Sequence, residues 1–293
     1  MNKPAVRRPA PPPLPARRRS WIRIVVIGAL VAVLGGVVAV LIITRVERGE
    51  WSVPKVDDLS RIVQAAPRIP RTIYLERHAI EIHPGDNDSA HNVSSVLRNV
   101  RTKAAATAAA AKTAPTKPPL LPTRPAKLPG WKGTDKAWAQ VVSCVAKLYE
   151  PFDVTVTDRA PPEDQDRVLV AVGGKPGDLG VADRRVGGLA PFNGGLIERP
   201  VVFAFSAALG NGVRQVCETI GMEVAHAYGL DHAYLCSDVM TYLTPCGAKR
   251  FVDKSVRCGE GKPRVCEGGV PTQNSYQRLM QVLGPRPRPA SPS

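Results

Sequence analysis

Apolar residues recur at helical spacing in two segments between residues 134 and 228. The first segment follows Thr134 or Asp135, either of which can cap a helix. Its apolar stripe consists of Trp138, Val141, Val142, Val145 and Leu148. The second segment runs from about residue 211 to residue 228, and its stripe consists of Val213, Val216, Cys217, Ile220, Val224 and Ala227. Both patterns predict helices that turn one face toward a hydrophobic core.

Four short runs are rich in β-branched and aromatic residues, which is typical of strands. They cover residues 71–77, 153–158, 167–174 and 200–206, and the Gly-rich or polar pieces between them predict loops. We expect residues 71–100 to hold an outlying strand of the domain or the remnant of a pro-segment. The order of helix, strands, second helix and cysteine-rich loops predicts an α+β fold, with a twisted sheet beneath two helices.

An almost continuous apolar run covers residues 21–44 and is interrupted only by Arg23. A helix of this length can cross a hydrocarbon core of about 30 Å. Basic residues before the run outweigh those after it, so we expect a single-pass membrane protein with a cytoplasmic N-terminus and an extracytoplasmic C-terminal domain. A cleavable signal peptide is the alternative, but no small-x-small cleavage site follows the run. Gly28, Ala32 and Gly36 have the spacing of a weak transmembrane dimer contact.

Composition divides the rest of the chain. Residues 1–20 are basic and Pro-rich and predict a disordered cytoplasmic tail, and residues 45–70 predict a linker. Residues 101–130 are rich in Ala, Lys and Pro, which is typical of a semi-stiff tether. We therefore expect the compact domain to span residues 131–284 and to be followed by a disordered tail at residues 285–293.

The formal net charge of +15 at first suggests a nucleic-acid partner. Nucleic-acid binding would need the basic residues on a folded surface beside aromatic stacking groups. Instead, many of them belong to the Pro-rich head and to the predicted tether. We therefore expect no nucleic-acid partner, and contact of the basic segments with anionic lipid at most.

All six cysteines lie between residues 144 and 266. Their even number predicts three disulfides and an oxidising compartment. Their positions suggest the pairs Cys144–Cys217, Cys236–Cys246 and Cys258–Cys266, which is one of several pairings that six cysteines allow.

The residues with the strongest chemical signal lie at 222–232, which read MEVAHAYGLDH, and at 237–242, which read SDVMTY. Positions 222 and 226 are four residues apart and therefore share one face of a helix. Gly229 can adopt the left-handed conformation that ends a helix, which would let the chain bring His232 back toward the same point.

Residues 222–232 resemble the metzincin signature HExxHxxGxxH, and residues 237–242 resemble the Met-turn that accompanies it. Upstream segments are similar to bacterial extracytoplasmic relatives of matrixin-like proteases. The resemblance implies a metzincin-like domain that binds zinc, with His226 and His232 as ligands, Glu223 as the general base and Met240 beneath the metal. Tyr242 matches the tyrosine that some metzincins use as an additional zinc ligand, so the resemblance implies that it is a ligand or stabilises the oxyanion.

One position departs from the signature, because Met222 stands where the first zinc-binding histidine is expected. A thioether is a soft, neutral ligand that suits Cu(I) better than zinc, whereas zinc sites use thiolate, imidazole and carboxylate. The residues that could complete the pair of imidazoles are Tyr242, Asp231, His78, His83 and His91.

Three hypotheses follow. The first is a membrane-anchored extracytoplasmic zinc metallopeptidase that hydrolyses peptide bonds of a polypeptide substrate with zinc-activated water. The second is a catalytically inactive pseudoenzyme that keeps the cleft and binds polypeptide or envelope components. The third is a structural surface protein held together by disulfides, which explains the residues of the two motifs least well.

Overall fold

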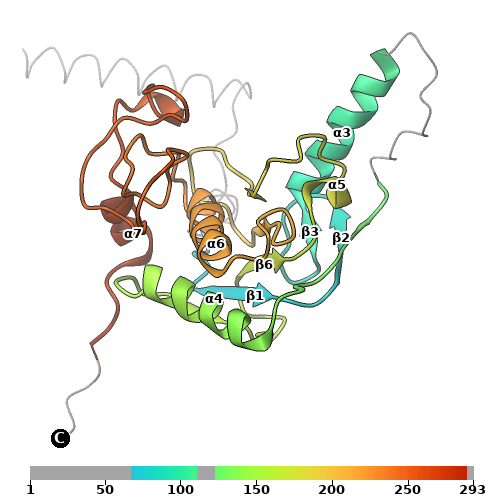
Figure 1. The fold of residues 1–293 in the computed structure, drawn as a ribbon, viewed down its shortest axis with the longest axis horizontal. Helices are drawn as coiled ribbons and strands as arrows, with labels where there is room; N and C mark the ends of the chain where they lie inside the picture. The colour runs from blue at the N-terminus through green and yellow to red at the C-terminus, as the bar shows by residue number, and fades with distance from the viewer. Residues whose placement is uncertain (1–66, 111–122, 289–293) are drawn as a thin grey trace, which may run out of the picture. The chain divides into compact units, whose positions relative to one another are not determined.

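The computed structural model describes residues 67–110 and 123–288 (Figure 1). Its centre is a five-stranded sheet in the order β5-β1-β6-β8-β7. The strands are β1 (Thr72–Glu76), β5 (Thr155–Thr157), β6 (Val168–Val172), β7 (Gly188–Leu189) and β8 (Val201–Ala204). All neighbouring strands are parallel except β7, which runs antiparallel to β8 at one edge. The described part is therefore an α+β domain with a mixed sheet.

Both faces of the central sheet are covered. Alternate residues of β6 and β8 enter two separate hydrophobic clusters, with Val170 and Val202 in one and Ala171 and Phe203 in the other. The first cluster lies under helices α4 (Asp135–Leu148), α6 (Val213–Ala227) and α7 (Ser275–Leu283). The second lies under a three-stranded sheet of β3 (Val93–Ser94), β2 (Ile80–Pro84) and β4 (Ala126–Leu128), with helices α3 (Ser95–Ala110) and α5 (Pro176–Leu179). Burial on both faces explains why β6 and β8 are uninterrupted apolar runs in the sequence.

The two helices predicted from apolar spacing are α4 and α6. Thr134 caps α4, because its side chain accepts a hydrogen bond from the backbone N–H of Ala137 at 3.2 Å. The two helices cross at Gly221, where a Cβ atom would lie only 2.8 Å from Leu148 Cδ1. The buried Tyr149 hydroxyl donates to the carbonyl of Gly221 at 2.9 Å. This close crossing fixes the orientation of α6, which carries the candidate site.

The predicted place of the first strand is wrong. Strand β1 is not outlying, because Ile73 pairs with Val156 of β5 on one side and with Val168 of β6 on the other. The compact domain therefore includes residues 71–100 and does not begin at residue 131. Parallel strands pair with segments that lie far away in the sequence. The composition near residue 72 therefore does not show which strands flank β1 in the sheet.

The predicted tether at residues 101–130 is also wrong in its described parts. Residues 101–110 continue α3, and Ala126–Leu128 form β4, which pairs with β2. Alanine has the highest intrinsic helix propensity, so the Ala-rich run extends the helix. Residues 111–122 lie outside the described part of the chain.

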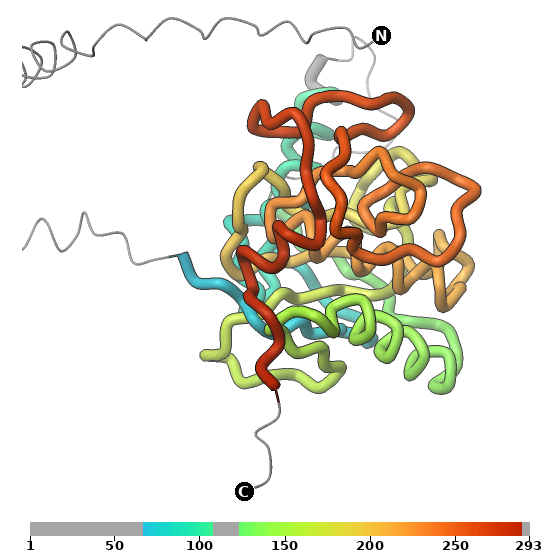
Figure 2. Tube along the Cα trace, turned by 90° about the vertical axis from the view of Figure 1, so that its left-hand side faces the viewer, coloured from blue at the N-terminus to red at the C-terminus, as the bar shows by residue number. Residues whose placement is uncertain are grey.

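The predicted C-terminal tail begins too early at residue 285. Pro285 forms a bridge with Phe152, and the backbone N–H of Arg286 donates to the carbonyl of Pro151 at 3.0 Å. At the other end of the described chain, Arg71 donates to the carbonyl of Leu283. The two ends of the described domain therefore run close together (Figure 2).

The predicted cytoplasmic tail and transmembrane helix, residues 1–44, lie outside the described residues, as does most of the linker. Within residues 67–110 and 123–288, no helix has both the length and the apolar content needed to cross a membrane.

All six cysteines form disulfides, and the pairs are Cys144–Cys217, Cys236–Cys246 and Cys258–Cys266. This is the pairing that the positions along the chain suggested. The first disulfide joins α4 to α6, and the other two close short loops around the Met-turn and beyond it.

We predict different losses of stability when the disulfides are removed one at a time. Loop-closure entropy of the unfolded chain gives about 4 kcal/mol for Cys144–Cys217, with its separation of 73 residues, and about 2.5 kcal/mol for Cys258–Cys266, with its separation of 8. Denaturant unfolding of the Cys144→Ala/Cys217→Ala and Cys258→Ser/Cys266→Ser variants measures both values. Equal losses, or a larger loss for the shorter loop, would contradict the prediction.

Candidate metal centre on helix α6

The candidate site is built by the end of α6 and the turn that follows it. Gly229 has a φ of +87°, and its backbone N–H donates to the carbonyl of His226 at 2.9 Å. A side chain here would also collide with Arg278, because a Cβ atom would lie 2.8 Å from its Nη2 atom. The turn brings His232 back onto His226, so that the ring centres are 4.6 Å apart and the rings are nearly perpendicular.

His226 is buried and its ring is fixed by the backbone. Its Nδ1 atom lies 2.7 Å from the carbonyl oxygen of Leu230. A carbonyl only accepts hydrogen bonds, so we assign the proton to Nδ1 and the free lone pair to Nε2. Burial lowers the pKa of His226 to about 4, with a further contribution from the nearby His232. The ring is therefore neutral near pH 7, the form in which imidazole binds a metal.

His232 is held in the same tautomer by a carboxylate. Its Nδ1 atom lies 2.6 Å from Oε1 of Glu260, which leaves Nε2 free. Glu260 is ionised, because the hydrogen bond from Arg264, together with that from His232, lowers its pKa. Histidines that bind metals through Nε2 commonly donate their other N–H group to a carboxylate or a carbonyl. Both imidazoles of the site have this arrangement.

Tyr242, the last residue of the Met-turn segment, lies against His232. Its ring centre is 4.4 Å from that of His232, and its side chain is about half exposed. Partial burial, followed by the negative charges of Glu223 and Glu260, raises the pKa of the Tyr242 hydroxyl to about 12. The phenol therefore stays protonated near pH 7 unless a cation is bound beside it.

The Met-turn supports the segment that carries His232. Met240 is fully buried in the main hydrophobic cluster, and its carbonyl accepts a hydrogen bond from the backbone N–H of Ala233 at 3.0 Å. Asp238 accepts from the Met240 backbone N–H at 2.9 Å and from the hydroxyl of Ser275 in α7 at 2.6 Å. The turn thereby connects α7 to the residue that follows His232.

Glu223 is a carboxyl group that is almost completely buried in the structure. Burial raises its pKa to about 8. The group lies against edge strand β7, where a Cβ atom on Gly188 would be 2.5 Å from Glu223 Cγ and 2.6 Å from Oε1. A larger residue at position 188 would therefore displace this carboxyl from its position in the structure.

Met222, which stands at the departing position of the motif, is partly buried and packs against the main hydrophobic cluster. It shares this apolar environment with the stripe of α6, although helical spacing predicted that it would face the site. Its side chain thus has a packing role in addition to its place beside His226.

The other residues considered as ligands are engaged elsewhere. The Asp231 carboxylate accepts two hydrogen bonds from Arg264, at 2.6 and 2.8 Å, and two more from backbone N–H groups. The three remaining histidines lie in the layer of β2 and β3, beside nearby carboxylates. The pairs are His78–Glu76, His83–Glu81 and His91–Asp88.

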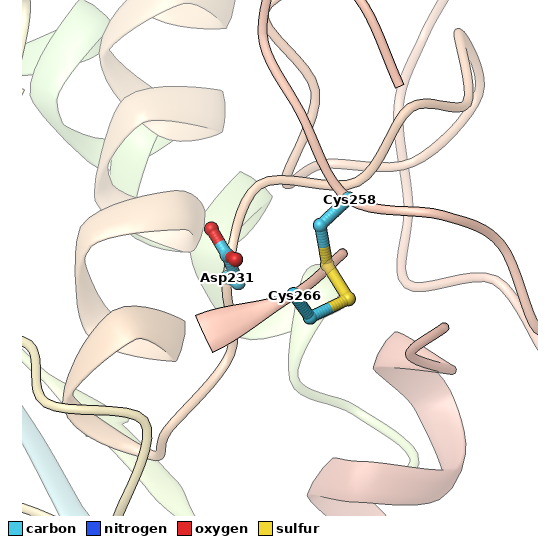
Figure 3. A group of neighbouring side chains, drawn as sticks. All are labelled: Asp231, Cys258 and Cys266. Carbon is cyan, nitrogen blue, oxygen red and sulfur yellow. A yellow bond between two sulfur atoms is a disulfide. The ribbon is translucent and has the colours of Figure 1, made fainter. Parts of the chain in front are cut away.

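Two clusters of three groups that could ligate a metal occur among the described residues, and neither includes His226. One consists of Asp231, Cys258 and Cys266, but the two cysteines form a disulfide and offer no thiolate (Figure 3). In the other, Asp231 and Glu260 lie beside His232, but Arg264 already neutralises both carboxylates. Glu260 and Arg264 were not foreseen from the sequence, where only the flanking cysteines mark their loop.

We predict that the contribution of Glu223 to the stability of metal-free protein declines as the pH rises from about 4.5 to about 8. The folded pKa of about 8 exceeds the ordinary value of 4.5, so in this window the folded state keeps a proton that the unfolded chain has lost. The stabilisation is complete below the pKa that Glu223 has in the unfolded chain, and it is lost as the pH rises through the pKa in the folded protein. Between these two pKa values, the free energy of unfolding falls by about 1.4 kcal/mol per pH unit. Denaturant unfolding of wild type and Glu223→Gln in a chelator at each pH measures the difference. Parallel curves for the two proteins would contradict the raised pKa.

The chain was also compared with known proteins. No model of a protein family matches it, and no curated protein sequence matches it significantly. The assignment of the site therefore depends on the two motifs and on the geometry of His226, His232, Glu223 and Tyr242.

Proposed function

We propose that the protein is a membrane-anchored extracytoplasmic zinc metallopeptidase of the metzincin type. The observation that carries the proposal is the pair of imidazoles, His226 and His232, whose Nδ1 atoms are both occupied by oxygen acceptors and whose rings lie 4.6 Å apart. The buried Glu223 precedes His226 by one turn on α6, and the ring of Tyr242 lies against that of His232. Two histidines placed for packing alone would not need this common orientation.

The two histidines fit a zinc ion. Two imidazoles bound through Nε2 to one tetrahedral zinc would have ring centres about 5 Å apart, given Zn–N distances of about 2.0–2.1 Å. The observed separation of 4.6 Å is close to that value. Both rings are oriented with a free Nε2 atom, and His226 is neutral at physiological pH.

Tyr242 is the group that we assign as the third ligand. It contacts His232, whereas Asp231 and the other histidines are engaged elsewhere. Binding through the phenolate requires loss of a proton whose pKa is about 12. The zinc affinity of this set should therefore be lower than that of three imidazoles, and should increase with pH.

Zinc at this position would polarise the scissile carbonyl group and lower the pKa of a bound water toward 7. Glu223 is suited to accept the proton of that water, because its pKa of about 8 in the absence of a cation allows it to take up and return protons near neutral pH. Gly188 and the neighbouring core confine the carboxyl to one position.

The substrate class follows from the sheet edge beside Glu223. Strand β7 is the last strand of the sheet, so its outer side has backbone groups without a strand partner among the described residues. An extended polypeptide can add to such an edge through backbone hydrogen bonds, largely independent of its sequence. We therefore propose a polypeptide substrate that lies along β7 with its scissile bond near Glu223.

The proposed location rests on two features. The apolar segment at residues 21–44 would anchor the chain in the membrane, and the three disulfides suit an oxidising compartment outside the cytoplasm.

A second candidate function is a pseudoenzyme that binds polypeptide or envelope components without cleaving them. The observation that favours it is Met222, a thioether that packs against the core at the position of the first ligand. Without a third imidazole, the cleft and edge strand could still bind an extended chain.

Zinc content tests the proposed function. We expect purified full-length protein to bind one zinc weakly, His226→Ala to bind none, and Met222→His to bind at least 10-fold more tightly because a third imidazole completes the site. Tyr242→Phe keeps the ring but removes the ligand oxygen. As a single substitution it should weaken zinc binding, whereas in combination with Met222→His it should have little effect. Zinc in Met222→His but none in wild type would support the pseudoenzyme, and zinc in neither would overturn the site assignment.

Substitution at Gly188 tests the role of Glu223. Gly188→Ala would place a methyl group within 2.5 Å of Glu223 Cγ, so we predict that peptide hydrolysis falls by about 10²-fold because the base is displaced. Gly187→Ala is the matched control, since its Cβ atom would lie 3.1 Å from Leu209 Cδ2 and does not approach Glu223. Hydrolysis of a quenched fluorescent peptide library measures both variants, and equal activities would exclude the assigned position of Glu223.

A further inference from the structure

The loop at residues 258–266, here named the clip loop, is covalently closed and joined to the segment of His232. Cys258 and Cys266 form its disulfide, with their Cα atoms 4.9 Å apart. The backbone N–H of Gly259 donates to the carbonyl of His232 at 3.0 Å, and Cys258 forms a bridge with Ala233. The clip loop therefore starts directly beside the second histidine of the candidate site.

Two charged residues of the clip loop act together on His232. Glu260 Oε1 accepts from His232 Nδ1 at 2.6 Å and from Arg264 Nη2 at 2.8 Å. Because one oxygen accepts both bonds, Arg264 fixes the carboxylate oxygen that meets the imidazole. Glu260 is 44 % exposed, so its position depends on these bonds more than on burial.

Arg264 completes a closed network through Asp231. The guanidinium donates to both carboxylate oxygens of Asp231, at 2.6 and 2.8 Å, and Asp231 accepts from the backbone N–H of His232 at 2.7 Å. Asp231 also lies against the Cys258–Cys266 disulfide, within 4.8 Å of its sulfur atoms (Figure 3). Backbone and side chain of His232 are thus both held by the clip loop, directly or through Asp231.

We infer that Glu260 is a positioning residue for His232, and that the Cys258–Cys266 disulfide maintains it in place. Glu260 keeps the proton of His232 on Nδ1 and fixes the orientation of the ring that lies against His226. The effect of Glu260 on zinc binding rests on the proposed function, whereas its positioning of the His232 ring does not.

The lack of a third imidazole makes this positioning more important. With only two imidazoles, the site has few strong bonds to a metal. Its zinc affinity therefore depends more on whether each ligand is already correctly oriented before the metal binds. Loss of a hydrogen-bond partner behind a metal ligand typically lowers metal affinity by about 10–100-fold. We expect loss of Glu260 to lie within this range.

Chemical reduction is unsuitable as a test of the disulfide. It would produce two cysteine thiols beside Asp231, and thiolates bind zinc strongly. Serine substitutions open the clip loop without creating this second metal site.

The first experiment uses full-length protein with ¹⁵N-labelled histidine in the absence of metal. Nitrogen chemical shifts report the tautomer of His232, which should be the Nδ1–H form in wild type. Glu260→Ala should give a mixture of tautomers, and Glu260→Gln should restore much of the Nδ1–H form because an amide oxygen can also accept. Glu267→Gln is the matched control, since this exposed carboxyl adjoins the clip loop and does not contact His232. An unchanged tautomer in Glu260→Ala would overturn the inference, whether or not zinc binds.

The second experiment measures zinc affinity by competition with a chelator. Glu260→Ala and Cys258→Ser/Cys266→Ser should each bind zinc about 10–100-fold more weakly than wild type. Cys144→Ala/Cys217→Ala controls for the general loss of stability and should retain wild-type affinity. Cys258→Ser/Cys266→Ser and Cys144→Ala/Cys217→Ala could lose zinc affinity equally. The loss would then not be specific to the clip loop, which would refute the role of its disulfide. Absence of zinc from wild type would refute the proposed function, and the tautomer measurement would still decide whether Glu260 positions His232.

Discussion

The turn at Gly229 is the constraint on which the candidate site depends. It ends α6 and reverses the chain within a few residues, so that two imidazoles from different segments face each other. The fold holds this turn from two sides. The hydroxyl of the preceding residue, Tyr228, donates to the carbonyl of Pro70 at 2.8 Å, and Arg278 of α7 lies over the glycine itself. A residue at the start of the domain and a helix at its end therefore both stabilise one reversal in the middle.

Two carboxyl groups near the site have opposite properties because their surroundings differ. Glu223 is buried, which raises its pKa, whereas Glu260 is partly exposed and bonded to Arg264, which lowers its pKa. The first is suited to exchange a proton, and the second to remain charged and hold an imidazole. One site thereby contains a neutral and an ionised carboxyl near neutral pH, which is how folded proteins assign acid–base and structural roles to the same chemical group.

Local sequence patterns predicted the elements whose signals lie within one segment. Apolar spacing located α4 and α6, and β-branched runs located β1, β6 and β8. The central position of β1 was missed, because its partners β5 and β6 lie far away in the sequence. Glu223, His226 and His232 were proposed as site residues from the resemblance of residues 222–232 to the metzincin signature. Glu260 was not, because it reaches His232 across an irregular loop, and no periodicity describes a contact of this kind.

The position of β1 has a mechanical consequence. The first element of the described domain is this strand, and β1 pairs in parallel with a strand on each side. A pull on the preceding linker would act along the strand and load the hydrogen bonds of both ladders together. Bonds loaded together in shear resist force better than bonds that open one after another. The domain would thus resist a pull on its N-terminal end at one of its mechanically strongest points.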